Sequence, residues 1–349
     1  MRQPYCGERF RNCSISHLGD PLQDLQDEWK PLPEPEPKCR SGGSFVSFLS
    51  GDIFVPAAIC LLRQLRRVNS ACPVSLVVDA ANVSPNNTRR VVREFGQGSV
   101  LRLDTLQTSP AALAAVARAS KVPLGGRGKK VAGRLTNISL SSSSKWEIKA
   151  LHKLWLFALP DSLFPLACFL DLDVLVLANI DGLLSERTLG AGGGLAAVPA
   201  LGCRHGANVF NSAVFVFRPS ISTFESLLRR ERTYDRVGQA CENAFTDQSL
   251  LNAQFRGGCP AYNHPTPCRN LEWRRLPLNY NVNIQMWSSV PGAHWEGIKV
   301  AVIHFAGAYA KPWNQMPLSS SKSTRYQSLE RERVMRYRWR RDCSTSMHE

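Results

Sequence analysis

The chain has 349 residues, of which 44% are hydrophobic, and this is enough to bury the core of one large domain or two ordinary ones. A chain that is disordered throughout is therefore excluded. With 43 basic and 28 acidic residues the net charge is +15, which favours an anionic partner such as a phosphate group, a nucleic acid or a membrane surface.

The two ends of the chain differ in composition from its middle. Residues 1–43 are polar and proline-rich, so we expect a disordered, extended leader there. Residues 317–349 are rich in serine and then in arginine, and we expect a solvated basic tail in which a helix can form. The folded domain is expected over 44–316. The leader has no apolar stretch typical of a signal peptide, so we expect a cytoplasmic protein, with the Golgi lumen and the plastid left open.

Strand and helix patterns alternate directly after the leader. The expected strands are 45–49, 74–78 and 100–103, and the expected helices between them are 59–65 and 89–95. Residues 122–144, rich in Gly, Lys and Ser, are typical of a surface loop, and helical spacing follows over 147–159. Alternation of this kind predicts an α/β domain with a parallel sheet.

The rest of the domain continues the pattern. The expected strands lie in 165–177, which holds two apolar runs, and at 195–198, 209–217 and 300–305; the expected helices are 222–232 and 246–255. The longest apolar neighbourhood, 154–180, is interrupted by aspartates, so no stretch reaches the roughly 18 uncharged apolar residues of a membrane span.

The 11 cysteines include no C-x-x-C pair, so they predict neither a zinc site nor a regular disulfide framework. Cys259 and Cys268 flank a short loop and could pair if the compartment is oxidising.

Two carboxylates at the end of an apolar run form the first candidate site. Asp171 and Asp173 are two residues apart, so in a strand both side chains project to one side. Two like charges there need a cation, and carboxylates suit Mg²⁺ or Mn²⁺ with a substrate phosphate as companion. A solvated turn is the alternative, but 167–170 is too apolar for an ordinary surface loop. Open α/β sheets also bind ligands at the carboxyl ends of their strands.

A histidine at the end of the last expected strand is the second candidate. His304 is followed by Gly307, which lets the backbone approach a ligand, and by Lys311, which suits a phosphate. A structural histidine is the alternative. An imidazole that joins two carboxylates would favour Mn²⁺ over Mg²⁺.

Polar residues in apolar surroundings form the third group. Asn211 lies inside the apolar run 209–217, where its amide either ties neighbouring strands or binds a ligand. Asp247 and Gln248 stand at the start of an expected helix, where capping would explain one such residue but not both.

Six motifs follow one another in a fixed order along the chain. They are K-L at 153–154, F-L-D-L-D-V-L-V-L-A-N-I-D at 169–181, F-N-S-A-V-F-V-F at 210–217, T-D-Q-S-L-L-N at 246–252, L-P-L-N-Y-N at 276–281, and H-F-A-G with K-P-W-N within 304–314. Through this ordered series the chain resembles the glycogenin-like branch of family 8 glycosyltransferases. The series is specific for the family, though not for the substrate of one member.

The resemblance implies a GT-A fold, which is a single Rossmann-like α/β domain with a mixed, mostly parallel sheet flanked by helices. It also implies a UDP-sugar donor, Mn²⁺ with Mg²⁺ as the other option, and retention of configuration. By position, Asp171, Asp173 and His304 would ligate the metal. The donor would be bound by Ser50, Asp52, Phe54, Val78, Leu172, Gly307 and Lys311, and the sugar would be surrounded by the catalytic group Lys153, Asn211, Asp247 and Gln248.

Some positions depart from the family pattern. Phe54 stands where glycogenins have a tyrosine, a change that stacking on uracil should survive. Residues 196–200 lack a sugar-binding aspartate, so the donor sugar stays open. Met286 and Trp287 stand where the self-glucosylated tyrosine would be, and neither carries a hydroxyl. We therefore expect transfer of a hexose, glucose being favoured, to a separate acceptor.

Other functions remain open. Within the family, the alternatives are a glucuronosyl-, a galactosyl- or an inositol-directed transferase. From another class, a basic nucleic-acid-binding protein would explain the charge, but only Tyr326, Tyr337 and Trp339 are aromatic residues placed among the tail's arginines, so this is disfavoured. The acceptor, whether a glycan, a protein or a small molecule, and a homodimeric state are left open.

Overall fold

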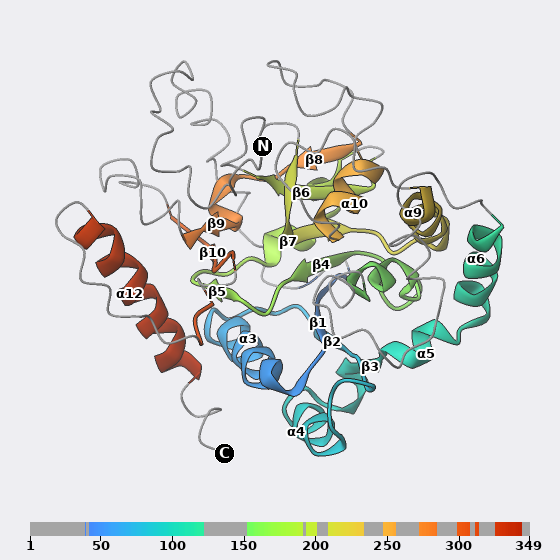
Figure 1. Cartoon of the computed structure of the whole chain (residues 1–349). Coiled ribbons are helices and arrows are strands. Elements are labelled where there is room, and N and C mark those ends of the chain that lie inside the picture. Colours follow the sequence, from blue (N-terminus) through green and yellow to red (C-terminus); the bar gives the residue numbers. More distant parts are fainter. Residues whose placement is uncertain are drawn as a thin grey trace, which may run out of the picture. The chain divides into compact units, whose positions relative to one another are not determined.

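The computed structural model describes residues 39, 42–121, 152–190, 193–200, 209–233, 247–255, 272–284, 299–307, 311–313 and 325–343 (Figure 1). The chain divides into two compact units. Unit 1 comprises Met1–Lys30, Asp104–Leu166 and Glu186–Leu276, and unit 2 comprises Pro31–Leu103, Ala167–Ser185 and Pro277–Glu349.

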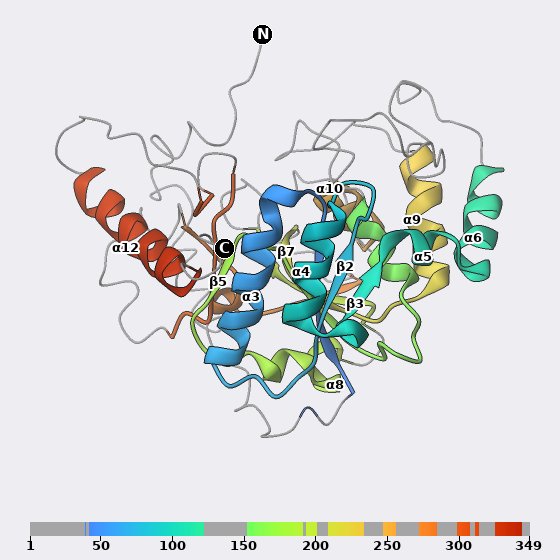
Figure 2. The same ribbon diagram turned by 90° about the horizontal axis from the view of Figure 1, so that it is seen from below.

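Unit 2 begins with alternating strands and helices. In chain order these are β1 (Ser44–Leu49), the 3-10 helix η3 (Asp52–Phe54), α3 (Val55–Arg67), β2 (Val74–Val78), α4 (Pro85–Phe95), η4 (Gln97–Ser99) and β3 (Val100–Arg102). With β4 (Ala167–Leu170) the strands are ordered β3-β2-β1-β4, and β1 pairs in parallel with both β2 and β4. The helices α3 and α4 pack against β1 and β2 respectively (Figure 2).

These elements form where the sequence predicts them, for local reasons. The strands β1 and β2 are almost continuous apolar runs, because strands of a parallel sheet are buried on both faces. The helix α4 begins at Pro85, and the Ser84 side chain accepts a hydrogen bond from the backbone N–H of Asn87.

A small second sheet in unit 2 has the strand order β5-β10-β9. It consists of β5 (Val174–Val176), β10 (Val302–His304) and β9 (Val282–Asn283), accompanied by η7 (Asp181–Leu184) and η9 (Leu278–Tyr280). The strand β10 runs antiparallel to β5, with His304 opposite Val174. This pairing brings His304, which lies far away in the sequence, to the turn between β4 and β5.

The basic tail contains the helix α12 (Arg325–Cys343), which packs against α3 (Figure 2). Arg336, Trp339 and Cys343 are buried, and their spacing of three and four residues puts them on one face of the helix. The expectation of a helix is therefore confirmed, while the expectation of a solvated tail is wrong for this face.

Two disulfides lie in unit 2, Cys39–Cys72 and Cys60–Cys343. The second joins α3 to the C-terminal end of α12. The expectation that the cysteines form no framework is wrong for these four, because their pairing depends on which elements pack together and not on sequence spacing. Cys259 and Cys268 lie outside the described residues.

Unit 1 contains a sheet segment with the strand order β7-β6-β8. The strands are β6 (Leu195–Pro199), β7 (Phe210–Phe217) and β8 (Trp273–Arg275); β6 is antiparallel to β7 and parallel to β8. The other elements are α5 (Leu103–Gln107), α6 (Pro110–Ser120), η6 (His152–Ala158), α8 (Glu186–Leu189), α9 (Ile221–Thr233) and α10 (Asp247–Gln254).

An aromatic core holds unit 1 together. The ring of Phe157 in η6 lies 4.8 Å from that of Phe217 in β7, and Trp155 lies 4.6 Å from Phe224 in α9. The part of the helix expected over 147–159 that the structure describes is a 3-10 helix, and residues 147–151 lie outside the description.

The prediction of an α/β fold with a mixed, mostly parallel sheet flanked by helices is confirmed. The domain limits 44–316 stay a prediction. Within the described residues, none of the helices combines the length and the apolar character that crossing a membrane requires.

Candidate functional site

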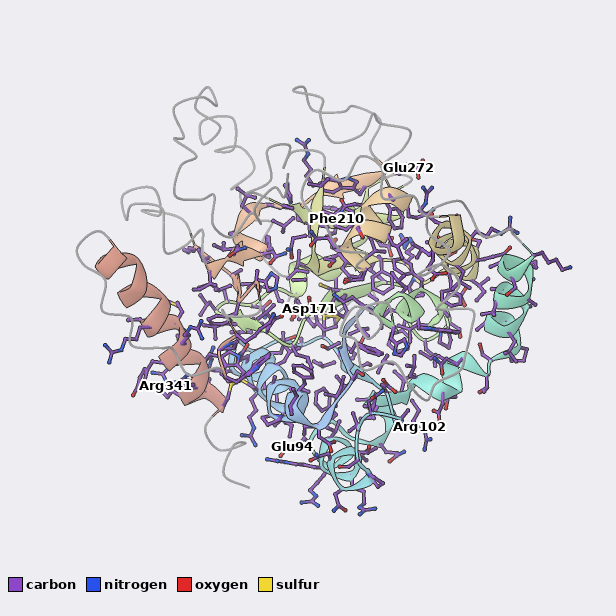
Figure 3. The ribbon with its side chains drawn as sticks, in the orientation of Figure 1. Glu94, Arg102, Asp171, Phe210, Glu272 and Arg341 are labelled. Carbon is purple, nitrogen blue, oxygen red and sulfur yellow. A yellow bond between two sulfur atoms is a disulfide. The ribbon has the colours of Figure 1, made fainter. Side chains whose placement is uncertain are left out.

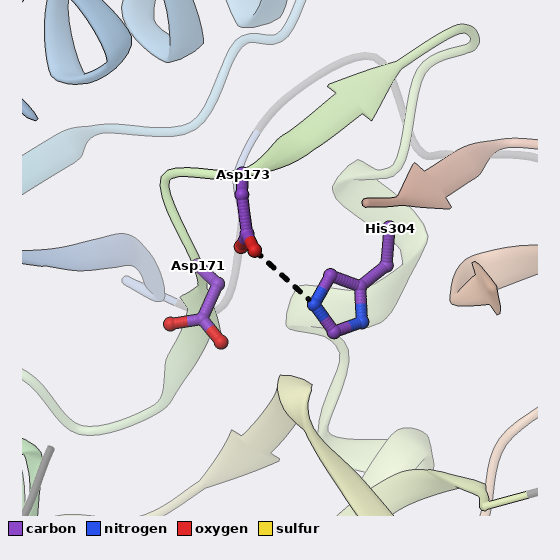
Figure 4. Close-up of side chains that lie close together, drawn as sticks. All are labelled: Asp171, Asp173 and His304. Carbon is purple, nitrogen blue, oxygen red and sulfur yellow. Dashed lines mark ion pairs between the residues drawn. The ribbon is translucent and has the colours of Figure 1, made fainter. Parts of the chain in front are cut away.

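The three predicted metal ligands lie together in unit 2 (Figure 4). Asp171, Asp173 and His304 each offer one ligand atom, and these atoms all lie within 4.8 Å of one another. Asp171 directly follows β4, Asp173 directly precedes β5, and His304 ends β10, so the short turn between two strands and the β5–β10 pairing place all three. The backbone N–H of Phe305 also donates to the carbonyl of Asp173, at 2.9 Å, which fixes the two segments to each other.

These three side chains are called the metal cluster below, and Asp173 is their electrostatic centre. Its Oδ2 lies 3.5 Å from Nε2 of His304 and accepts a hydrogen bond from the ammonium group of Lys311. Burial by itself raises the pKa of Asp173, but the charges and hydrogen bonds of His304 and Lys311 outweigh it, and the pKa lies well below the usual range. The carboxylate is therefore ionised at neutral pH, which is the form that binds a metal.

The donor set fits a hard divalent cation. Ligands of an octahedral Mg²⁺ lie about 2.1 Å from the ion and hence up to about 4.2 Å from one another. A spread of 4.8 Å among the three ligand atoms needs only a small adjustment of side chains. Two carboxylate oxygens and one imidazole nitrogen suit Mn²⁺ or Mg²⁺, and a three-ligand site leaves coordination positions for phosphate oxygens.

Two of the predicted donor-binding residues, Ser50 and Val78, lie at the carboxyl ends of β1 and β2. Ser50 directly follows β1 and is buried, and its hydroxyl donates to Oδ2 of Asp79 at 2.7 Å. Val78, the last residue of β2, is fully buried. The side chain of Asn82 donates to the same Asp79 oxygen, also at 2.7 Å.

Asp79 was missed by the sequence reasoning. It is 2% exposed and directly follows β2, just as Asp171 directly follows β4. The same rule, an acidic residue at the carboxyl end of an apolar strand, would have found it.

Asp52 has a local structural role. Its side chain accepts a hydrogen bond from the backbone N–H of Ser84 at 2.8 Å, at the start of α4. A hydrogen bond from Asn87, followed by the one from Ser84, lowers the pKa of Asp52. These contacts join the loop after β1 to the loop after β2.

Three aromatic side chains pack one against the next, beginning at Phe54. The ring of Phe54 packs edge-on to Trp313 at 5.7 Å, and Trp313 lies 5.9 Å from Trp339 of α12. Phe54, which the family resemblance places at the uracil, therefore rests on an aromatic support that comes from the C-terminal part of the chain.

The remaining predicted donor residues lie close to the metal ligands in sequence. Leu172 is buried between the two aspartates. Gly307 is exposed and has φ of +90°, a conformation that other residues rarely adopt. The ammonium group of Lys311 lies 3.4 Å from the carbonyl oxygen of Phe305 in addition to its contact with Asp173.

The predicted catalytic residues form a second cluster, in unit 1. Nζ of Lys153 in η6 lies 2.8 Å from Oδ2 of Asp247 at the start of α10, and both side chains are buried. The hydroxyl of Ser212 in β7 donates to the same oxygen at 2.8 Å, and its backbone N–H donates to Oε1 of Gln248 at 3.1 Å. Asn211, half-buried beside them, accepts from the backbone N–H of Ala213 at 2.9 Å. The predicted residues are brought together, while their roles stay a prediction.

Asn252 is a structural amide that the sequence reasoning missed. It is buried in α10, it accepts from the backbone N–H of Phe210 at 2.8 Å, and it donates to the carbonyl of Phe210 at 2.8 Å. Asn252 thus ties α10 to β7, and the role of Asn211 stays open. Met286 and Trp287 lie outside the described residues.

The known proteins that are similar in sequence to this chain include glycogenins and galactinol synthases. No family model matches the chain. It is 34% identical to glycogenin-1 of Oryctolagus cuniculus over 161 residues, which are 45% of the chain and 40% of that protein. It is 25% identical to galactinol synthase 1 of Ajuga reptans over 296 residues, which are 77% of the chain and 73% of that protein. The chain spans less than half the length of the glycogenins it matches.

Solved structures align over most of the chain. The apo structure of the bifunctional glycosyltransferase WbbM covers 89% of this chain and 52% of its own, with a TM-score of 0.49 and 16% identity. The galactosyltransferase LgtC in complex with donor and acceptor sugar analogues covers 83% and 95%, with a TM-score of 0.46 and 16% identity.

The mostly parallel sheet, with an Asp-x-Asp pair directly after one of its strands, confirms the predicted α/β fold class. The sequence relatives, which are glycogenins and galactinol synthases, confirm the predicted resemblance to glycogenin-like glycosyltransferases.

Proposed function

We propose that this chain is a metal-dependent, retaining glycosyltransferase that transfers a hexose, glucose in the first instance, from a UDP-sugar to a separate acceptor. The observation that carries the proposal is the metal cluster at the end of β4, with Lys311 in contact with Asp173. A nucleoside diphosphate needs both parts, a divalent cation and a further positive charge.

The residues of unit 2 would bind the UDP part of the donor. Asp171, Asp173 and His304 would hold Mn²⁺ or Mg²⁺, which when bound offsets the charge that develops on the leaving diphosphate. Lys311 would add its own charge to that of the leaving group. The burial of Ser50 and the aromatic support under Phe54 are consistent with a pocket for the base and ribose.

The residues of unit 1 would bind the sugar. Lys153 and Asp247 form a buried ion pair to which the Ser212 hydroxyl donates, and Gln248 accepts from the backbone N–H of Ser212. Such groups provide the donors and acceptors that orient sugar hydroxyls. We assign Asp247 and Gln248 to the face of the sugar where the reaction occurs, with Lys153 and Asn211 holding their positions.

Galactosyl transfer is the second candidate. The similarity to a galactinol synthase extends over 77% of the chain, whereas the match to glycogenin-1 of Oryctolagus cuniculus extends over 45%. The donor sugar therefore has to be found by experiment.

A panel of UDP-sugars tests the proposal. With Mn²⁺ present, we expect one donor to be turned over, and Asp173→Asn to lower that rate by about 100-fold or more, because the metal loses a ligand. The matched control is Asp161→Asn, which changes an exposed aspartate and leaves the rate unchanged. Equal rates for Asp173→Asn and wild type, or no turnover of any donor, would contradict the proposal.

Mass spectrometry of the protein after the same incubation tests for a separate acceptor. We expect no added hexose on the chain, since the residues at the expected attachment point carry no hydroxyl. A stepwise gain of hexose mass would show self-glycosylation instead.

The disulfides bear on the cellular compartment. Disulfides persist in oxidising compartments and are rare in the cytosol. Cys39–Cys72 and Cys60–Cys343 therefore favour the lumenal alternative over the expected cytoplasmic location. Fractionation of cells combined with thiol labelling of the native protein tests this, and labelling of these four cysteines without prior reduction would contradict it.

The structure weakens the nucleic-acid alternative. Trp339, one of the three tail aromatics on which that alternative depended, is 1% exposed and packs against Trp313. An aromatic ring in that position offers no stacking surface to a base.

A further inference from the structure

The helix α12 contacts the segment that carries Lys311. Nη1 of Arg336 donates to the backbone carbonyl of Lys311 at 2.5 Å, and Nε of Arg340 donates to the carbonyl of Pro312 at 3.2 Å. The ring of Trp339 packs on Trp313. Three side chains from successive turns of one helix thus contact three consecutive residues, 311–313.

The helix itself is anchored to the elements around the metal cluster. Cys343 is bonded to Cys60 of α3, and Asp342 is paired with Arg67 of the same helix. The guanidinium of Arg67 also donates to the carbonyl of Val176 in β5 at 2.9 Å. The strand β5 begins directly after Asp173, so α12 is fixed to the strand that follows a predicted metal ligand.

The burial of Arg336 shows that this contact is more than a surface interaction. The residue is 4% exposed, and burying a guanidinium is costly unless it is hydrogen-bonded. In contrast, Arg333 on the same helix is exposed, and Arg341 points outward (Figure 3). The arginines of the tail are therefore not equivalent.

We propose that α12 is a positioning element of the donor site and that Arg336 is its positioning residue. By holding the carbonyl of Lys311, Arg336 fixes the backbone from which the ammonium group reaches Asp173 and, if the proposed function holds, the diphosphate of the donor. Arg336 touches no reacting atom and acts through Lys311.

Calorimetric titration with UDP in the presence of Mn²⁺ measures the expected effect. We expect Arg336→Ala to weaken UDP binding by about tenfold, because a loosely held Lys311 loses more freedom on binding. Arg336→Lys keeps a hydrogen-bond donor but lacks the planar guanidinium group, so its affinity for UDP should lie between those of Arg336→Ala and the wild type. Arg333→Ala is the matched control and should bind UDP as the wild type does.

A double-mutant cycle separates positioning from general stabilisation. If Arg336 acts through Lys311, then adding Arg336→Ala to Lys311→Ala should weaken UDP binding no further. Additive losses in the double variant would overturn the proposal, and so would wild-type affinity in Arg336→Ala.

A second readout does not depend on the donor. Acetylation of the lysines under native conditions, followed by mass spectrometry, reports how well Lys311 is held. We expect Lys311 to react several-fold faster in Arg336→Ala than in the wild type or in Arg333→Ala, with a control lysine, Lys121, unchanged. An unaltered Lys311 rate would overturn the proposal even if UDP binds, whereas a wild-type protein that binds no UDP would instead count against the proposed function.

Discussion

At the residue scale, the chemistry of the candidate site depends on Asp173. One of its oxygens is approached by both His304 and Lys311, and Asp171 offers a further carboxylate within the same cluster. A carboxylate that is buried among cations stays ionised to a low pH, and its protonation costs folding free energy.

We expect Asp173→Asn to destabilise the protein at neutral pH and to lose this effect in acid. The pKa of Asp173 is lower in the folded chain than the value of about 3.9 for an unfolded aspartate, so the unfolded state binds the proton more tightly. The stabilisation from Asp173 is therefore fully present above about pH 5 and declines as the pH falls from about 4 toward the folded pKa.

Urea unfolding of the metal-free protein at about pH 7, pH 5 and pH 3.5 measures this. The difference in free energy of unfolding between wild type and Asp173→Asn should be equal at the two higher values and smaller at the lowest. A difference that does not change with pH would contradict the prediction.

The sequence predicted the metal cluster and Lys311, but it did not predict Asp79 or Arg336. Asp171 and Asp173 follow an apolar strand and His304 ends another, which is a local pattern. Asp79 satisfies the same pattern and could have been predicted. Arg336 could not, because its burial depends on the packing of α12 on α3, and the sequence around it is uniformly rich in arginine.

At the element scale, α10 joins the Lys153–Asp247 ion pair to the sheet of unit 1. Its first residue is Asp247, and Asn252, five residues later, bonds both backbone groups of Phe210 in β7. These two bonds keep α10 from sliding along its axis and from rotating about it. Apolar runs and helical spacing predicted these elements, whereas the amide that joins them was not distinguishable from other polar residues of a helix.

We expect Asn252→Ala to lower the free energy of unfolding by about 3 kcal/mol, because it leaves the buried backbone groups of Phe210 without partners. Urea unfolding measures it. Gln254→Ala, a change of a half-buried amide in the same helix, is the comparison and should cost less than about 1 kcal/mol. Equal losses of unfolding free energy in the two variants would contradict the prediction, because the contacts with Phe210 would then contribute no more stability than those of Gln254.

At the scale of the whole molecule, the two disulfides found among the described residues close loops of very different length. Cys39 and Cys72 are 33 residues apart, and Cys60 and Cys343 are 283 apart. Neither pairing could be read from the sequence, since a chain with 11 cysteines allows many pairings and only the packed fold selects among them.

We expect the Cys60→Ser, Cys343→Ser double variant to be destabilised more than the Cys39→Ser, Cys72→Ser double variant. The loss of unfolded-state entropy predicts up to about 6 kcal/mol for the longer loop and about 4 kcal/mol for the shorter one. Denaturant unfolding of both variants and of the wild type, without reductant, gives the ranking. The opposite ranking would show that local contacts at the cysteines outweigh loop length.

The Cys60–Cys343 bond can form only after both cysteines have been synthesised. At about 5 to 20 residues per second, a ribosome needs roughly 14 to 57 s to pass from Cys60 to Cys343. Throughout that interval Cys60 lacks its native partner, although Cys72 lies only 12 residues further along the chain and is synthesised early in the interval. The bond can form only after α12 has been synthesised, so the element that holds Lys311 is set in place long after α3, the helix to which it is joined.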